Sequence, residues 1–164
     1  MIRATIRQRR GAIVLAGGQG TRLQALTAAL VGAAVPKQYC PLFDHGETML
    51  ERTMRRVALS VRPQRTATVV VRSHRQFYEP VAASGQTGAL VVQPENRGTA
   101  PAVLYGLGRL AHPMQLDAVA IFPSDHYVDN DRRFMRHVDL AFAAVQAAPG
   151  VIILLGIVPT AAEV

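Results

Sequence analysis

The stretch GGQGTRL, residues 17–23, combines three glycines with an arginine directly after the apolar run AIVLA at 12–16. Glycines let backbone N–H groups approach a phosphate closely, and the guanidinium of Arg22 can hold a phosphate through two parallel hydrogen bonds. These residue types in this order predict a phosphate-binding loop. The alternative is a tight surface turn that carries a solvated arginine.

Two well-known phosphate loops do not fit this stretch. The dinucleotide fingerprint G-x-G-x-x-G requires a glycine where Leu23 stands, and a Walker A loop requires Gly-Lys-Ser/Thr where Thr21 to Leu23 stand. The sequence therefore disfavours a nicotinamide-dependent oxidoreductase and a P-loop NTPase.

Two further charged residues could act beside a phosphate. Lys37 in VPKQY is the only lysine of the sequence, which suggests a place where a compact point charge is needed, although chance survival explains it equally well. Asp125 in PSDH follows an apolar run, and Mg²⁺ prefers one or two carboxylates together with substrate phosphates. Asp125 is thus a candidate metal ligand, with a turn or a helix cap as the alternative; His126 could support it or be purely structural.

Amide side chains gather in QPENRGTAPA, residues 93–102, after another apolar run. Gln93 and Asn96 can both donate and accept hydrogen bonds, as the reading of a nucleobase edge requires. Thr99 is expected to cap the helix that follows.

The elements that must position these residues can be predicted from hydrophobic patterning. Continuous apolar runs that alternate with helical stripes indicate a Rossmann-like α/β domain, with a mostly parallel sheet and helices on both faces. Ligands in such sheets bind at the carboxyl ends of the strands. Buried strands are predicted at 12–16, 67–71, 89–93, 118–122 and 151–157. Helices are predicted after a Thr48–Glu51 capping box and at 76–83, 99–111 and 131–147, and residues 23–47 are predicted to form a long irregular loop.

The composition limits the class of protein. A chain of 164 residues with 49% hydrophobic residues suits one domain, and it has no apolar stretch of the ~20 residues that cross a bilayer, so we expect a cytoplasmic protein without membrane contact. The net charge of +7 favours anionic partners. Residues 1–10 are predicted to be a basic tail ahead of a domain at 11–164. Nucleic acid is not expected as a partner, because the other arginines are not interleaved with aromatic residues.

Taken together, the ordered motifs resemble the sugar-1-phosphate nucleotidyltransferase family, and within it most of all the mannose-1-phosphate guanylyltransferases. The resemblance covers residues 12 to about 160 and rests on the motifs GGQGTRL, PKQY, QPENRGTAPA, FPSDH and LLGIVPT. It implies a Rossmann-like nucleotide-binding fold and transfer of GMP from GTP to mannose 1-phosphate, with release of pyrophosphate.

The resemblance also implies roles for individual residues. The nucleotide phosphates would be held by Gly17, Gly18, Gly20, Thr21 and Arg22.

By the same resemblance Lys37 would balance phosphate charge near the reacting centre. Gln93, Asn96 and Gly98 would contact the base and ribose, and Asp125 would bind the metal, Mg²⁺.

The sequence departs from the family pattern in three places. Gln24-Ala25 stand where proline and leucine are usual, and Gln93 replaces a glutamate in a stretch whose Asn and Arg order also differs. Family members continue beyond the length of this chain into a sugar-binding segment, so a C-terminally truncated nucleotide half is expected. The alternatives are a nucleotide-binding or regulatory remnant without catalysis, or a related enzyme that uses another nucleoside triphosphate. An uncovered apolar VIILLGI would favour a homo-oligomer.

Overall fold

The computed structural model describes residues 9–158, which form an α/β domain around a four-stranded sheet. All strand pairs are parallel, and the strand order is β3-β2-β1-β4. The strands are β1 (Arg10–Leu15), β2 (Thr66–Val71), β3 (Ala89–Gln93) and β4 (Ala118–Pro123). Leu15 is in register with Val69 and Pro123, so the carboxyl ends of the central strands meet at one edge.

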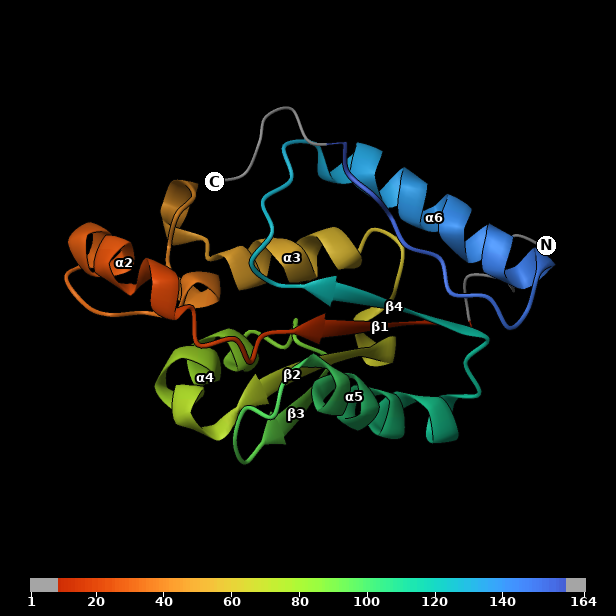
Figure 1. Cartoon of the computed structure of the whole chain (residues 1–164), viewed down its shortest axis with the longest axis horizontal. Helices are drawn as coiled ribbons and strands as arrows, with labels where there is room; N and C mark the ends of the chain where they lie inside the picture. Colours follow the sequence, from red (N-terminus) through yellow and green to blue (C-terminus); the bar gives the residue numbers. More distant parts are fainter. Residues whose placement is uncertain (1–8, 159–164) are drawn as a thin grey trace.

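Helices cover both faces of this sheet, as the sequence predicted (Figure 1). Helices α3 and α6 lie on one face, and α5 lies on the other. The helices are α2 (Gln24–Val31), α3 (Met49–Val57), α4 (Arg75–Ala83), α5 (Thr99–Met114) and α6 (Asp131–Ala147). Short 3₁₀ turns include η1 (Thr21–Leu23), η2 (Lys37–Tyr39), η4 (Pro63–Arg65) and η5 (Arg72–His74).

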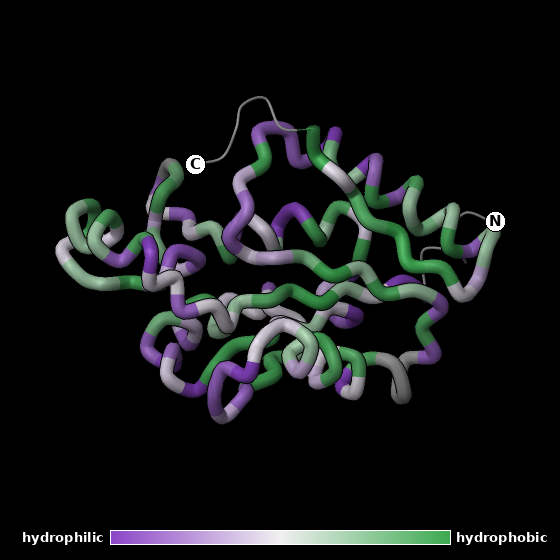
Figure 2. Tube along the Cα trace, viewed as in Figure 1, coloured by the Kyte–Doolittle hydropathy of each residue, from purple (hydrophilic) through white to green (hydrophobic). Residues whose placement is uncertain are grey.

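The core has two parts because successive side chains of a strand point to opposite faces. Val14 of β1 packs with Leu50 of α3 and Phe142 of α6, whereas Ile13 packs with Leu110 of α5 on the other side. The strands are correspondingly apolar along their length (Figure 2). Burial on both faces explains why the strands have continuous rather than alternating hydrophobic patterns.

Local signals fix two of the helix starts. The predicted capping box before α3 is present: Thr48 N donates to Glu51 Oε2 at 2.8 Å, and Glu51 N donates to Thr48 Oγ1 at 3.2 Å. Asn130 caps α6 by accepting from Arg133 N at 2.9 Å. Helix α5 differs from the expectation, because its N-cap is Gly98, at φ 91°, and Thr99 is its first residue.

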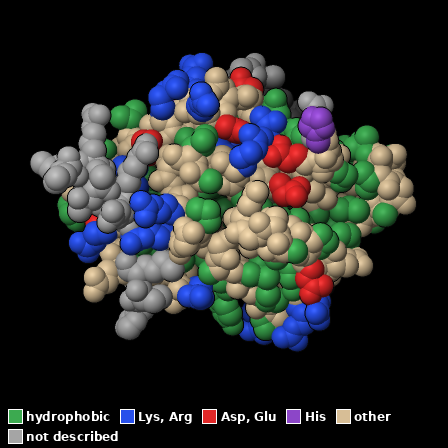
Figure 3. All heavy atoms as spheres, turned by 180° about the vertical axis from the view of Figure 1, so that it is seen from behind, with side chains coloured by type: hydrophobic (Ala, Val, Ile, Leu, Met, Phe, Trp, Pro, Cys, Tyr) green, Lys and Arg blue, Asp and Glu red, His purple; other side chains and the backbone are tan. Residues whose placement is uncertain are grey.

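The prediction that residues 23–47 are irregular is wrong in part, because α2 lies within this stretch. Its alanines and leucines favour a helix, but apolar residues stand all around it and therefore show no periodic stripe. Leu26 and Leu30 remain more than half exposed, and the end of the molecule where α2 lies is largely uncharged on the face seen in Figure 3.

The strand predicted at 151–157 is also wrong, since residues 151–158 form no strand. The aliphatic run indicated β propensity, but a strand exists only when its backbone pairs with a neighbour. In the described residues this run follows α6 without joining the sheet, and Ile152 is 91% exposed.

The predicted basic tail lies mostly outside the described residues, since these begin at Arg9. Arg9 pairs with Asp117 at 3.1 Å, and Arg10 is the buried first residue of β1 and pairs with Asp139 at 2.6 Å. Within residues 9–158 every helix is too short or too polar to cross a membrane.

Candidate functional site

A cavity of about 260 Å³ lies at the carboxyl ends of the strands. Within the sheet, β2 and β3 follow one another on one side of β1, and β4 then lies next to β1 on its other side. Such a switch point between neighbouring strands is where ligands bind in open parallel sheets. The cavity is lined by Leu15, Gly17, Gly18, Gly20, Gln38, Gln93, Asn96, Gly98, Thr99, Ala102, Pro123, Ser124 and Asp125.

The predicted glycine loop follows β1 and forms one wall of this cavity. Gly20 adopts φ 61°, a left-handed conformation that glycine reaches without strain. A Cβ at this position would meet the backbone nitrogen of Lys37 at 3.2 Å, and one at Gly17 would meet Val71 Cγ1 at the same distance. Glycine is therefore required at Gly20 for conformation, and both positions leave little room for a side chain.

Gln38 holds the glycine loop in place, a role that sequence reasoning missed. Its buried side-chain amide donates to Ala16 O at 3.1 Å and to Gly18 O at 2.7 Å. The hydroxyl of Tyr39 also donates to Ala16 O, at 3.0 Å. The only signal in the sequence was its position beside Lys37 in the PKQY motif.

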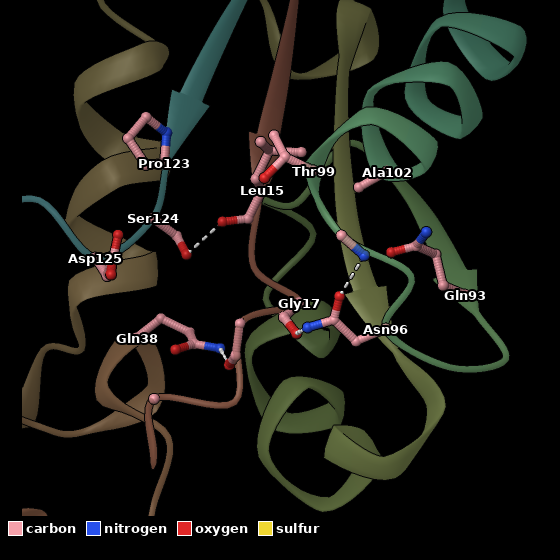
Figure 4. Close-up of a pocket in the computed structure, with 13 residues that line it drawn as sticks. Leu15, Gly17, Gln38, Gln93, Asn96, Thr99, Ala102, Pro123, Ser124 and Asp125 are labelled. Atoms are coloured by element: carbon pink, nitrogen blue, oxygen red, sulfur yellow. Dashed lines mark hydrogen bonds between the residues drawn. The ribbon is translucent and has the colours of Figure 1, made fainter. Parts of the chain in front are cut away.

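A second loop, between β3 and α5, forms the opposite wall. Gln93 is buried and lines the cavity, but its side chain makes no hydrogen bond to any residue in the described part of the chain. Asn96 bridges two loops, because its Nδ2 donates to Gly17 O at 3.2 Å while its Oδ1 accepts from Gly98 N at 2.9 Å. Figure 4 shows the Gln93 amide extending toward the cavity, on the side opposite Asp125.

The residues after β4 complete the cavity. Ser124 is tied to β1 because both its backbone nitrogen and its hydroxyl donate to Leu15 O, at 3.1 Å and 2.7 Å. Asp125 lines the cavity with its side chain about half exposed, and His126 Nε2 lies 3.9 Å from Asp125 Oδ1, beyond hydrogen-bond distance.

A single carboxylate at this cavity fits a magnesium ion that also binds phosphate oxygens. Among the side chains that the structure describes, no group of three or more His, Cys, Asp or Glu could hold a metal alone. Asp125 could therefore supply one ligand, with the remaining ligands from phosphates and water.

Three of the predicted site residues do not line the cavity. Thr21 and Arg22 lie in the exposed turn η1, and Lys37 begins η2 with its side chain partly exposed. Lys37 nevertheless lies next to the loop, because its backbone nitrogen contacts Gly20. Thr21, Arg22 and Lys37 therefore lie near the glycine loop, outside the hollow itself.

Behind the glycine loop lies a buried group of rings. His74 packs edge-on against Tyr39, with ring centroids 5.7 Å apart, and Phe77 stacks on the same tyrosine. Burial lowers the pKa of His74, partly offset by its hydrogen bond to the backbone of Ala16, and burial raises the pKa of Tyr39. Both side chains are therefore neutral near pH 7 and act as support for the loop rather than as charges.

Comparison with known sequences matches the chain to one protein family and to several relatives. The model of the family described as Nucleotidyl transferase matches residues 11–163. Xanthan biosynthesis protein XanB of Xanthomonas campestris is 31% identical over 155 residues, which cover 92% of this chain and 31% of XanB. Alginate biosynthesis protein AlgA of Pseudomonas putida is 29% identical over 92% of this chain and 30% of its own length. The chain thus spans about a third of these relatives.

Solved structures show the same arrangement of elements. The crystal structure of a mannose-1-phosphate geranyltransferase from Thermus thermophilus superimposes with a TM-score of 0.70 at 33% identity, over 87% of this chain and 39% of that chain. A nucleotidyl transferase from Methanothermobacter thermautotroptrophicus, at 22% identity and a TM-score of 0.61, covers 80% of this chain and 57% of that protein and shares the fold.

Proposed function

The chain belongs to the nucleotidyl transferase family, and from this premise we propose that it transfers the GMP group of GTP to mannose 1-phosphate, forming GDP-mannose and pyrophosphate. The observation that carries the proposal is the side-chain amide of Gln93, which lines the cavity without a hydrogen-bond partner among the described residues. Because this amide reaches the open cavity, a ligand there can both donate to it and accept from it, as the edge of a nucleobase does.

The phosphates are proposed to lie along the glycine loop. The loop is held from behind by Gln38 and from the side by Asn96, so its backbone is ordered before a ligand arrives. An ordered loop loses little conformational freedom on binding. Arg22 and Lys37, beside Gly20, would neutralise phosphate charge where the triphosphate extends beyond the cavity.

The reaction requires no covalent nucleophile from the protein. A sugar-phosphate oxygen attacks the α-phosphorus in line with the departing pyrophosphate, so the protein must align two polyanions and offset their repulsion. Asp125 would hold Mg²⁺, which when bound neutralises charge on the phosphates and the leaving group. This role fits its place on the cavity wall opposite Gln93.

Three features support mannose 1-phosphate and GTP within the family. The Thermus thermophilus structure bears mannose 1-phosphate in its name and is 33% identical. XanB and AlgA, by name biosynthesis proteins for xanthan and alginate, match over 92% of the chain. The FPSDH motif around Asp125 resembles the guanylyltransferases, whereas Gln93 stands where they usually have glutamate, and its amide is also compatible with another nucleoside triphosphate.

The test is an assay of the purified chain with GTP, mannose 1-phosphate and Mg²⁺, in which released pyrophosphate is measured. We expect pyrophosphate from GTP in preference to UTP, dTTP or ATP, and a loss of at least about 100-fold in Asp125→Asn, which removes the charge that holds the metal. Absence of pyrophosphate from the wild-type chain would contradict catalysis by this chain.

A second candidate is a nucleotide-binding module without catalysis, favoured by the observation that Arg22 and Lys37 do not line the cavity. Calorimetric titration separates the two. GTP binding without pyrophosphate release supports the module, whereas the absence of both GTP binding and pyrophosphate release would refute both candidates.

A further inference from the structure

Two arginines of α3, Arg52 and Arg56, contact the loop that carries Asp125. This segment, residues 124–130, connects β4 to α6 and is called the Asp125 loop below. The carboxylate of Asp125 accepts no hydrogen bond from the described residues, so the course of the loop backbone determines where it lies. Contacts that hold the backbone of this loop therefore also determine the position of Asp125, the candidate metal ligand.

Arg56 anchors the far end of the Asp125 loop. Its side chain is only 3% exposed, and its Nε donates to Asp131 Oδ1 at 2.7 Å. Its second terminal nitrogen donates to His126 O at 3.3 Å, directly after Asp125. A buried ion pair contributes little net stability because both charges lose water, but its directional hydrogen bonds allow few alternative geometries.

Arg52 joins the Asp125 loop to the loop that carries Lys37. It donates to Val128 O at 2.8 Å, and its guanidinium lies over the rings of Tyr127 and Phe43, at 5.1 Å and 4.6 Å from their centroids. Those two rings stack on each other with centroids 6.0 Å apart. Phe43 belongs to residues 32–47, the Lys37 loop, so one guanidinium contacts both loops.

From this geometry we infer that Arg52 and Arg56 are positioning residues that hold Asp125 at a fixed place relative to the Lys37 loop. Ser124 fastens the start of the Asp125 loop to β1, and the two arginines fasten its middle and end to α3. The inference rests on the proposed function only in the metal role of Asp125. The restraint of the two loops by α3 is a separate, measurable property.

The variants are chosen so that the fold survives. Arg52→Met keeps an unbranched side chain of similar length but removes the charge and the donor, and Arg109→Met makes the same change at an exposed residue of α5, on the other face of the sheet. Tyr127→Ala removes one of the rings under the guanidinium from a residue that is 62% exposed, and Tyr127→Phe keeps it. The tyrosine pair gives a second test if Arg52→Met does not fold.

The first measurement is amide hydrogen exchange, which needs no ligand. We expect exchange in the Asp125 loop and at residues 41–47 to become about tenfold faster in Arg52→Met and Tyr127→Ala, with β2 and α5 unchanged. Arg109→Met and Tyr127→Phe are expected to match the wild type in these segments. Unchanged exchange in both Arg52→Met and Tyr127→Ala would overturn the inference.

The second measurement is the binding of Mn²⁺, used in place of Mg²⁺, in the presence of GTP, with free Mn²⁺ followed by electron paramagnetic resonance. We expect Arg52→Met to bind Mn²⁺ about tenfold more weakly than Arg109→Met, because Asp125 is no longer held in place. Faster exchange with unchanged Mn²⁺ affinity would overturn the positioning of Asp125. If the wild-type chain binds neither GTP nor Mn²⁺, the proposed function fails, and the exchange data alone decide whether α3 restrains the loops.

Discussion

Replacing Gln38 by leucine tests whether the glycine loop is ordered by a side chain behind it. Leucine has nearly the same volume as glutamine, so Gln38→Leu removes two hydrogen bonds without opening a large cavity. Ala16 O keeps the hydroxyl of Tyr39 as a donor, and Gly18 is exposed, so water can solvate its carbonyl. Neither acceptor is left buried and unpaired.

The expected loss of stability follows from the two hydrogen bonds that Gln38→Leu removes. A net contribution of about 0.5–1 kcal/mol for each hydrogen bond predicts a fall of about 1–2 kcal/mol in the free energy of unfolding. For a chain of this length that corresponds to a melting temperature lower by about 5 °C. The affinity for GTP should fall as well. Ordering one freed loop residue on binding costs about 1–2 kcal/mol, which corresponds to a roughly tenfold higher Kd.

Urea denaturation and calorimetric titration with GTP measure the two effects. Gln64→Leu is the matched control, because Gln64 is exposed in η4, before the amino end of β2 and away from the cavity. Tyr39→Phe removes only the second donor to Ala16 O and should lower stability by about 1 kcal/mol. If Gln38→Leu matches Gln64→Leu in both stability and GTP affinity, the loop is not ordered by this contact.

Two further changes test the backbone and the rings behind it. Gly20→Ala should cost about 1–2 kcal/mol of unfolding free energy, because alanine is strained at φ 61°, whereas Gly18→Ala, with no atom within 4 Å of its Cβ, should cost less than about 0.5 kcal/mol; equal costs in urea denaturation would contradict the strain. Burial lowers the pKa of His74, so the unfolded chain takes up the proton first and stability should fall as the pH drops below about 6.5. His74→Gln should flatten this dependence between pH 7.5 and 5.5, and an unchanged slope would show that other groups cause it.

The sheet could be predicted because its buried strands consist mostly of apolar residues. A short segment that is apolar on both faces, such as 67–71 or 118–122, is typical of a strand buried in a parallel sheet. The periodic apolar stripe at 131–147 matches the bounds of α6. The run at 151–157 has the same composition but forms no strand. The β propensity of a segment indicates that it can form a strand, but whether it does depends on a neighbouring strand, which the sequence of the segment does not reveal.

The candidate site was predictable where backbone topology alone brings residues together. Gln93 is the last residue of β3, and Gly17 and Asp125 follow β1 and β4, so their convergence follows from the carboxyl ends meeting at one edge. Gln38 and Arg52 follow no such rule. A glutamine in a loop and an arginine on a helix are usually solvated, and only the tertiary contacts show that each holds a loop.

The size of the cavity bears on the residues that do not line it. About 260 Å³ is below the roughly 300–1,000 Å³ typical of sites that enclose a small ligand. A nucleoside triphosphate bound at Gln93 would therefore extend out of the hollow, and along the glycine loop it would reach Gly20, which lies beside the backbone of Lys37. The exposure of Arg22 and the partial exposure of Lys37 are then what a phosphate-binding role requires, because long cationic side chains can close over an anion that protrudes from the cavity.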